Sequence, residues 1–240
     1  MGHLRRQQIG GTAALSAAAT FVFGFALFAT LLSDYTTGDP TPRESVAFVA
    51  DHEAALYVWN LVILVVFGVV LVPLVLALHE RVHSGAPFLA RTALAFGLIW
   101  AGLVIAAGMI ANIGLATVTE LYDTNPAQAE SVWSALDAVQ NGVGGGNELV
   151  GGLWVLLVSR AAMTEQALPR ALSRLGIVAG AAGIVTVVPA LEAVGAVFGL
   201  GLIAWFAWTG VVMLRSGGSR PAARDRHGAD GRAHRLAVSR

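Results

Sequence analysis

The sequence predicts an all-α integral membrane protein with six transmembrane helices. The chain has 240 residues, of which 56% are apolar and only 12% are charged. That leaves too few polar side chains to cover a water-soluble globule of this size. The apolar residues also gather in six stretches of about 17 to 27 residues, and about 20 helical residues cross a hydrocarbon core. The stretches are residues 9–32, 55–78, 92–118, 140–158, 175–191 and 194–214.

We therefore expect one six-span membrane domain, residues 9–214, between an N-terminal tail, residues 1–8, and a C-terminal tail, residues 215–240. The C-terminal tail is rich in arginine, glycine and alanine and poor in large apolar residues, so we expect it to be disordered. Arg5 and Arg6 precede the first apolar stretch as in a signal peptide. That stretch is longer than the apolar region of a signal peptide, and we expect it to be retained as a span.

Charged residues divide by segment in a way that predicts the topology. Arginine predominates in both tails and in the second and fourth loops, whereas aspartate and glutamate predominate in the first and third loops. Loops rich in arginine stay on the cytoplasmic side of a membrane. Both termini are therefore predicted to be cytoplasmic, as an even number of spans also requires.

Two segments between the spans are predicted to be helical. Residues 42–53 have the pattern of a short helix that leads into the second span. In residues 127–139 the apolar side chains recur at helical spacing, which predicts a short amphipathic helix on the outer surface with Trp133 at the headgroups. Three further aromatic residues fit an outer aromatic belt: Tyr57, Trp59 and Tyr122.

Two runs of residues resemble a known family. They are Leu56-Tyr57 followed by the run from Val72-Pro73 to Leu78, and Leu168-Pro169-Arg170-Ala171-Leu172 followed by Leu175-Gly176, Gly180 and Gly183. Both are similar to segments of an uncharacterised bacterial membrane family, the domain of unknown function 4386 family. The resemblance implies a bundle of six or seven spans in the bacterial inner membrane, without an established activity. It supplies no catalytic residues.

A motif at the end of the second stretch, residues 79–83, matches the H-E-x-x-H pattern of zinc peptidases. On a helix His79 and His83 share one face, so both imidazoles are placed to bind one zinc ion, with Glu80 as the general base. Arg81 would put a cation beside that ion, and the sequence offers no evident third ligand on the same side. We expect a polar helix end that binds no metal, and a zinc metallopeptidase is the alternative.

Five polar residues are predicted to lie in the outer half of the bilayer, where polar groups usually face the bundle interior or a watery cavity. Glycines 142–152 surround two of them and allow close helix packing or a helix break. In one interpretation the five form an outward-facing polar pocket, with Glu148 as a proton or cation site. In the other, the amides are hydrogen-bonding glue between helices and the carboxylates are solvated. The residues are Asn60, Asn112, Asn147, Glu148 and Glu192.

The function predicted from these observations is that of a multi-pass inner-membrane protein that binds a small ligand or ion, with a proton-coupled or small-molecule transporter as the alternative. We do not expect an enzyme or a cofactor. The chain has no cysteine, which excludes disulfides and thiolate chemistry. The expected partner is the lipid bilayer, with no nucleic acid, and the oligomeric state stays open.

Overall fold

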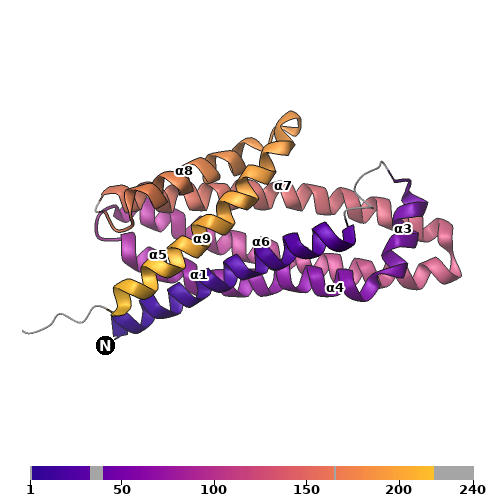
Figure 1. The fold of residues 1–240 in the computed structure, drawn as a ribbon. Coiled ribbons are helices and arrows are strands. Elements are labelled where there is room, and N and C mark those ends of the chain that lie inside the picture. The colour runs from indigo at the N-terminus through magenta and orange to yellow at the C-terminus, as the bar shows by residue number, and fades with distance from the viewer. Residues whose placement is uncertain (1, 33–39, 165, 219–240) are drawn as a thin grey trace, which may run out of the picture.

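The computed structural model describes residues 2–32, 40–164 and 166–218, and these segments are almost entirely helical. The long helices run up and down along a common axis (Figure 1). They are α1 (Gly2–Leu27), α5 (Phe67–Val82), α6 (Pro87–Thr124), α7 (Pro126–Thr164), α8 (Arg170–Val185) and α9 (Gly195–Gly218). Shorter elements are the π-helices η1 (Phe28–Leu32) and η2 (Leu61–Val66), the α-helices α3 (Pro42–Asp51) and α4 (Glu53–Asn60), and the 3₁₀-helix η3 (Pro189–Val194).

In the part of the chain that the structure describes, four helices are long and apolar enough to cross a membrane. They correspond to the first, second, third and sixth predicted stretches and cover Leu4–Leu31, Glu53–Val82, Pro87–Thr124 and Gly195–Ser216. The fifth stretch is divided between α8 and η3, and the 16 residues of α8 reach only about 24 Å. The fourth stretch lies within α7, whose glycines and polar residues lower its hydropathy. The structure thus supports an all-helical membrane protein, while four rather than six helices have the length and composition of spans.

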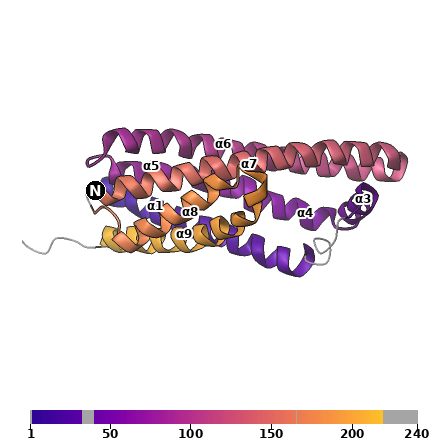
Figure 2. The ribbon, with the colours of Figure 1, turned by 90° about the horizontal axis from the view of Figure 1, so that it is seen from above.

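The prediction of a separate amphipathic surface helix at residues 127–139 was wrong. These residues continue into the fourth stretch without a break, as one 39-residue helix, α7. Their apolar side chains pack against α3 and the end of α6, where Val46, Val118 and Ala129 are buried in a small second core. Tertiary packing therefore holds the segment in the α6–α7 hairpin. Figure 2 shows this hairpin extending beyond the other helices, with α3 beside its far end.

Helix α3 confirms the short helix predicted at residues 42–53. Pro42 begins the helix, and Thr41 and Glu44 form a reciprocal N-terminal cap. The Glu44 carboxylate accepts hydrogen bonds from the backbone N–H and the hydroxyl of Thr41, both at 2.8 Å. The backbone bond and then the hydroxyl bond hold the pKa of Glu44 below its ordinary value. The cap fixes where α3 starts and how it meets the hairpin.

The main core of the bundle is a chain of aromatic rings that joins five helices. Ring centroids are 5.0 Å apart for Phe21 and Phe67, 5.2 Å for Phe67 and Trp100, 5.7 Å for Trp100 and Trp154, and 5.6 Å for Trp154 and Trp205. Most of these contacts are edge-to-face or tilted, the arrangements that aromatic quadrupoles favour. Trp154 and Trp205 are fully buried.

Charge separates the two ends of the described bundle. At the end where α1 starts and α5 and α9 finish, which we call the arginine end, lie Arg5, Arg6, Arg81, Arg91, Arg160, Arg170, Arg174 and Arg215. At the other end, which we call the acidic end, α3, the start of α4 and the α6–α7 turn carry Glu44, Asp51, Glu53, Glu120, Asp123, Glu130 and Asp137. Arg43 is the one arginine of the described residues at the acidic end.

Candidate functional site

The H-E-x-x-H residues lie at the arginine end, and the structure gives most of them other partners. His79 Nδ1 is 3.0 Å from the carbonyl oxygen of Ala90. Glu80 forms an ion pair with Arg6 of α1 at 2.5 Å. The ring centroids of His79 and His83 are 4.9 Å apart. Within the described residues no three histidine or acidic side chains gather closely enough to hold a metal ion.

Arg81, in the middle of the same motif, joins four parts of the bundle. Its Nε donates to the carbonyl of Ala167 at 2.8 Å, and its two terminal nitrogens donate to Gln7 Oε1 and Ser216 Oγ, both at 3.1 Å. Gln7 in turn donates to the carbonyl of Ala77 at 3.2 Å. A guanidinium with several fixed donors suits such a junction. Through these hydrogen bonds the motif connects α5 to α1, α9 and the α7–α8 loop.

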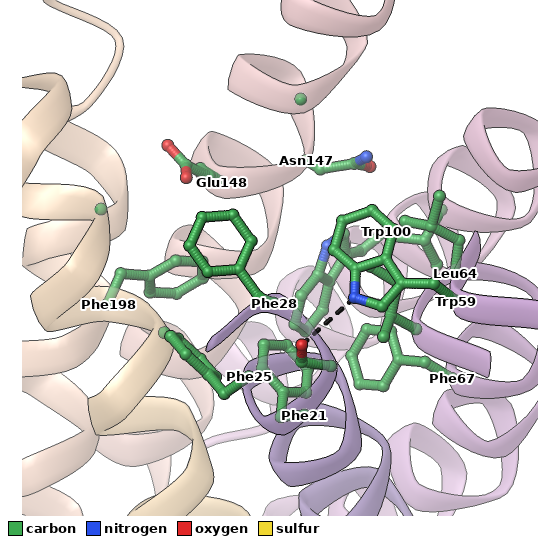
Figure 3. Close-up of a pocket in the computed structure, with 16 residues that line it drawn as sticks. Phe21, Phe25, Phe28, Trp59, Leu64, Phe67, Trp100, Asn147, Glu148 and Phe198 are labelled. Atoms are coloured by element: carbon green, nitrogen blue, oxygen red, sulfur yellow. Dashed lines mark hydrogen bonds between the residues drawn. The ribbon is translucent and has the colours of Figure 1, made fainter. Parts of the chain in front are cut away.

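A cavity of about 510 Å³ lies in the half of the bundle nearer the acidic end. This volume falls in the range of small-molecule sites. Residues of α1, η1, α4, η2, α5, α6, α7 and α9 line it, and Figure 3 shows their side chains converging on one space. Its walls are Phe21, Gly24, Phe25, Phe28, Trp59, Ile63, Leu64, Phe67, Trp100, Val104, Gly144, Asn147, Glu148, Gly195, Phe198 and Gly199.

Three departures from α-helical geometry meet at this cavity. Phe28 belongs to the π-helix η1, Leu64 belongs to the π-helix η2, and Gly195 directly follows the 3₁₀-helix η3. A π-helical turn holds more residues than an α-turn, which redirects the side chains beside it, and such turns are frequent at functional sites. The irregular turns therefore lie around the cavity on three of its sides in sequence, in η1, in η2 and directly before α9.

Seven of the sixteen residues that line the cavity are aromatic. Phe21, Phe25 and Phe28 recur on one face of α1 and η1, while Phe67 and Trp100 belong to the aromatic core and close the cavity toward the bundle centre. Such faces give a ligand a large apolar contact area.

One hydrogen bond ties the wall together. Trp59 Nε1 donates to the carbonyl of Gly24 at 3.2 Å. Trp59 thus lines the cavity and fixes α4 to α1, a role that its prediction as part of an aromatic belt did not include. Gly24 itself has no room for a side chain, because a Cβ there would lie 2.7 Å from Ile63 Cγ2.

Two adjacent residues of α7, Asn147 and Glu148, supply the polar groups of the wall. Their side chains point in different directions, Glu148 toward Phe198 and Asn147 toward Trp100 (Figure 3). Asn147 Oδ1 is buried and has no hydrogen-bond partner among the described residues. A Cβ on Gly195 would lie 3.0 Å from Glu148 Oε1, so the bare backbone of α9 leaves room for the carboxylate.

The structure brings together two of the five predicted site residues. Asn147 and Glu148 line the cavity. Asn60 ends α4 just before η2 without lining it, and Asn112 is buried elsewhere on α6 with an unpartnered Oδ1. Glu192 lies in η3, and its side chain falls outside the described residues. The cavity wall is mainly apolar, which corrects the prediction of a polar pocket.

The glycine run of α7 stays helical and does not break the helix as the sequence suggested. A Cβ added at Gly142, Gly144, Gly145 or Gly146 would meet no other atom within 4 Å. Gly144 lines the cavity, so the run leaves open space on the side of α7 where Asn147 and Glu148 lie.

Comparison with known families places this chain. The sequence model described as "Domain of unknown function (DUF4386)" matches residues 9–217. The chain belongs to this family. The match runs from α1 to the end of α9 and confirms the resemblance found in the sequence. The DUF4386 description names no activity, so the chemistry of this member has to be argued from its own side chains. No curated protein and no solved structure gave a match.

Proposed function

We propose that this DUF4386 protein is an inner-membrane protein that binds a small, largely apolar molecule in its aromatic cavity. The observation that carries the proposal is a cavity of about 510 Å³ at the meeting point of three irregular helical turns. Aromatic rings around an open space leave apolar surface without a partner, and a ligand that fills the space removes that surface from water. The unpartnered Asn147 amide would orient such a ligand.

The proposed topology has six membrane helices with both termini in the cytoplasm of a bacterial cell. The arginine end then faces the cytoplasm, as loops rich in arginine do, and the acidic end and the cavity face outward. In this arrangement α7 and α8 cross beside the four longer helices. Exposed apolar residues of α8, such as Val178 and Val185, would face the lipid.

The cavity lining favours binding over catalysis. Asn147 and Glu148 are the polar side chains among the described residues that line it, and they do not make the nucleophile and base pair that hydrolytic chemistry requires. At the arginine end, the partners of His79 and Glu80 support a structural role for the H-E-x-x-H motif. We therefore propose neither an enzyme nor a zinc cofactor.

The cysteine-free sequence allows a direct test of access to the cavity. We would introduce Gly144→Cys in the cavity wall and Gly102→Cys on the outer face of α6 as a matched control, because neither position has an atom within 4 Å of an added Cβ. A membrane-impermeant thiol reagent applied outside intact cells should label Gly144→Cys and not Gly102→Cys. Triphenylphosphine oxide, a neutral aromatic probe, should slow the labelling. Unprotected labelling, or none, would refute the proposal.

A transporter of the same ligand is a second candidate. Interrupted helices around a half-open cavity are typical of transporter binding sites, and the Trp100–Trp154–Trp205 stack separates this cavity from the arginine end. A proton-coupled transporter would produce a ligand-dependent pH change inside proteoliposomes, and Glu148→Gln would abolish it. The absence of any such change in wild-type proteoliposomes would leave binding alone.

A further inference from the structure

Glu148 is the single charged residue among those described as lining the cavity. No arginine or histidine of the described residues lies within salt-bridge distance of its carboxylate. A carboxylate beside apolar surface with no cation to pair with is costly, and natural proteins usually pair such a group. Among the described residues the cavity therefore offers one acidic side chain and no basic one, which leaves this carboxylate available to a cationic ligand.

The aromatic wall around that charge also attracts cations. The faces of phenylalanine and tryptophan rings carry partial negative charge, and a cation within about 6 Å of a ring centre is stabilised by it, most strongly by tryptophan. Trp59, Trp100 and Phe198 line the same space as the carboxylate. Aromatic rings beside a carboxylate suit an organic cation, whose charge is surrounded by apolar groups. A small hydrated metal ion suits the site less, because it would lose water here without gaining enough oxygen ligands.

The charge of the surrounding surface has the same sign. The acidic end carries seven described aspartate and glutamate residues outside the cavity against a single arginine, Arg43. Such a surface raises the local concentration of cations and repels anions. An approaching organic cation would thus meet favourable potential before it reaches Glu148.

We propose that the ligand class of this cavity is an organic cation, with a quaternary ammonium or phosphonium centre, or a similar one, beside the Glu148 carboxylate and its apolar groups against the aromatic wall. This inference rests on the proposed function and specifies its substrate. The same chemistry is offered by a free amphiphilic cation and by the ammonium headgroup of a membrane lipid.

The test uses two aromatic probes of similar shape that differ in charge, methyltriphenylphosphonium and neutral triphenylphosphine oxide. Equilibrium dialysis would measure both against the full-length protein in nanodiscs of phosphatidylglycerol, with empty nanodiscs as the background. Glu148→Gln should weaken phosphonium binding by about tenfold, as expected for losing one ion pair near a protein surface. Binding of the neutral probe should persist in this variant and fall far less than phosphonium binding, which also shows that the variant folds. Asp123→Asn, at an exposed position of the acidic end, is the control and should weaken phosphonium binding far less than Glu148→Gln, because its charge lies outside the cavity and is screened by salt.

The outcomes separate the two proposals. If neither probe binds wild-type protein above empty nanodiscs, the proposed function fails. If the neutral probe binds and Glu148→Gln leaves phosphonium binding unchanged, the cavity stands and the cation inference is overturned. Nanodiscs that contain phosphatidylcholine identify the source of the cation. Weaker phosphonium binding there indicates competition from a lipid headgroup, and equal binding indicates a free cation.

Discussion

The crossing of α7 and α8 offers a sharp test of the packing that positions Glu148. A Cβ on Gly152 of α7 would lie 2.6 Å from the carbonyl oxygen of Gly180 and 3.0 Å from the backbone nitrogen of Ile184. Both atoms are backbone, so no side chain can rotate away. A Cβ on Gly180 would in turn lie 2.6 Å from the carbonyl oxygen of Gly152. Gly152→Ala must therefore push the two helices apart.

The size of the effect follows from these distances. Ordinary Cβ contacts begin at 3.4 Å, so the helices must separate by roughly 0.8 Å at the crossing, and overpacking of this kind destabilises by about 1 to 3 kcal/mol. Alanine also favours a helix over glycine by about 1 kcal/mol. Gly142→Ala, on the same helix, gains that preference with no atom within 4 Å of its Cβ. The difference between the two variants isolates the crossing.

Thermal unfolding in detergent, followed by tryptophan fluorescence, measures that difference. At about 2 to 4 °C per kcal/mol for a chain of this length, Gly152→Ala should melt about 2 to 12 °C below Gly142→Ala. Equal melting temperatures for the two variants would show that α7 and α8 do not cross this closely. A Cβ on Gly183 of α8 would lie 2.9 Å from the carbonyl oxygen of Glu148, and this neighbouring contact would then be wrong as well.

Three further predictions concern the two ends of the bundle. Arg81→Lys keeps the charge but loses the forked set of hydrogen bonds, and should lower the unfolding free energy by about 1 to 3 kcal/mol. The control Arg91→Lys, at an exposed position, should leave it unchanged. Equal melting temperatures for the two variants would contradict the role of Arg81 in joining the helices. The pKa of Glu44 is lowered from its ordinary value of 4.5, so the ionised carboxylate stabilises α3 fully at a pH above that ordinary value. This contribution is lost as the pH falls through the lowered folded-state pKa. Hydrogen exchange of the α3 amides should therefore quicken on acidification relative to Glu44→Gln, and parallel pH profiles for the two proteins would refute the cap. Metal analysis after dialysis against a weak chelator should find no stoichiometric zinc in wild type or His79→Ala, whereas zinc present in wild type and lost in the variant would support the peptidase.

The sequence predicts the helices that lipid constrains and mispredicts those that tertiary packing constrains. A helix that crosses a hydrocarbon core needs about 20 apolar residues, whichever helices it packs against. The sequences of α1, α6 and α9 contain such stretches, so these helices could be predicted. The α7 segment was misjudged because its amphipathic start and its glycine run both resemble a helix boundary. Burial of Ala129 against α3 and α6 keeps the first part in the hairpin, and the glycines remain helical within the bundle.

The two polar residues of the cavity could also be predicted from the sequence. Asn147 and Glu148 stand out in an apolar stretch because burying polar groups is expensive. The aromatic wall was missed because a phenylalanine in a membrane helix looks the same whether it faces lipid or a cavity. The spacing of Phe21, Phe25 and Phe28 does place them on one helical face, and that was the available signal. The π-helical turns at the cavity have no comparable signature in the sequence.

The central claim is that the aromatic cavity binds a small molecule. Equilibrium dialysis of triphenylphosphine oxide against nanodiscs tests it most directly, with wild-type protein beside Gly144→Leu, which fills the cavity, and Gly102→Leu, which adds the same side chain on the outer face of α6. At both glycines an added Cβ would meet no other atom within 4 Å. We predict saturable binding to wild type and Gly102→Leu and its loss in Gly144→Leu. Equal binding to all three proteins, or none above empty nanodiscs, would contradict the account.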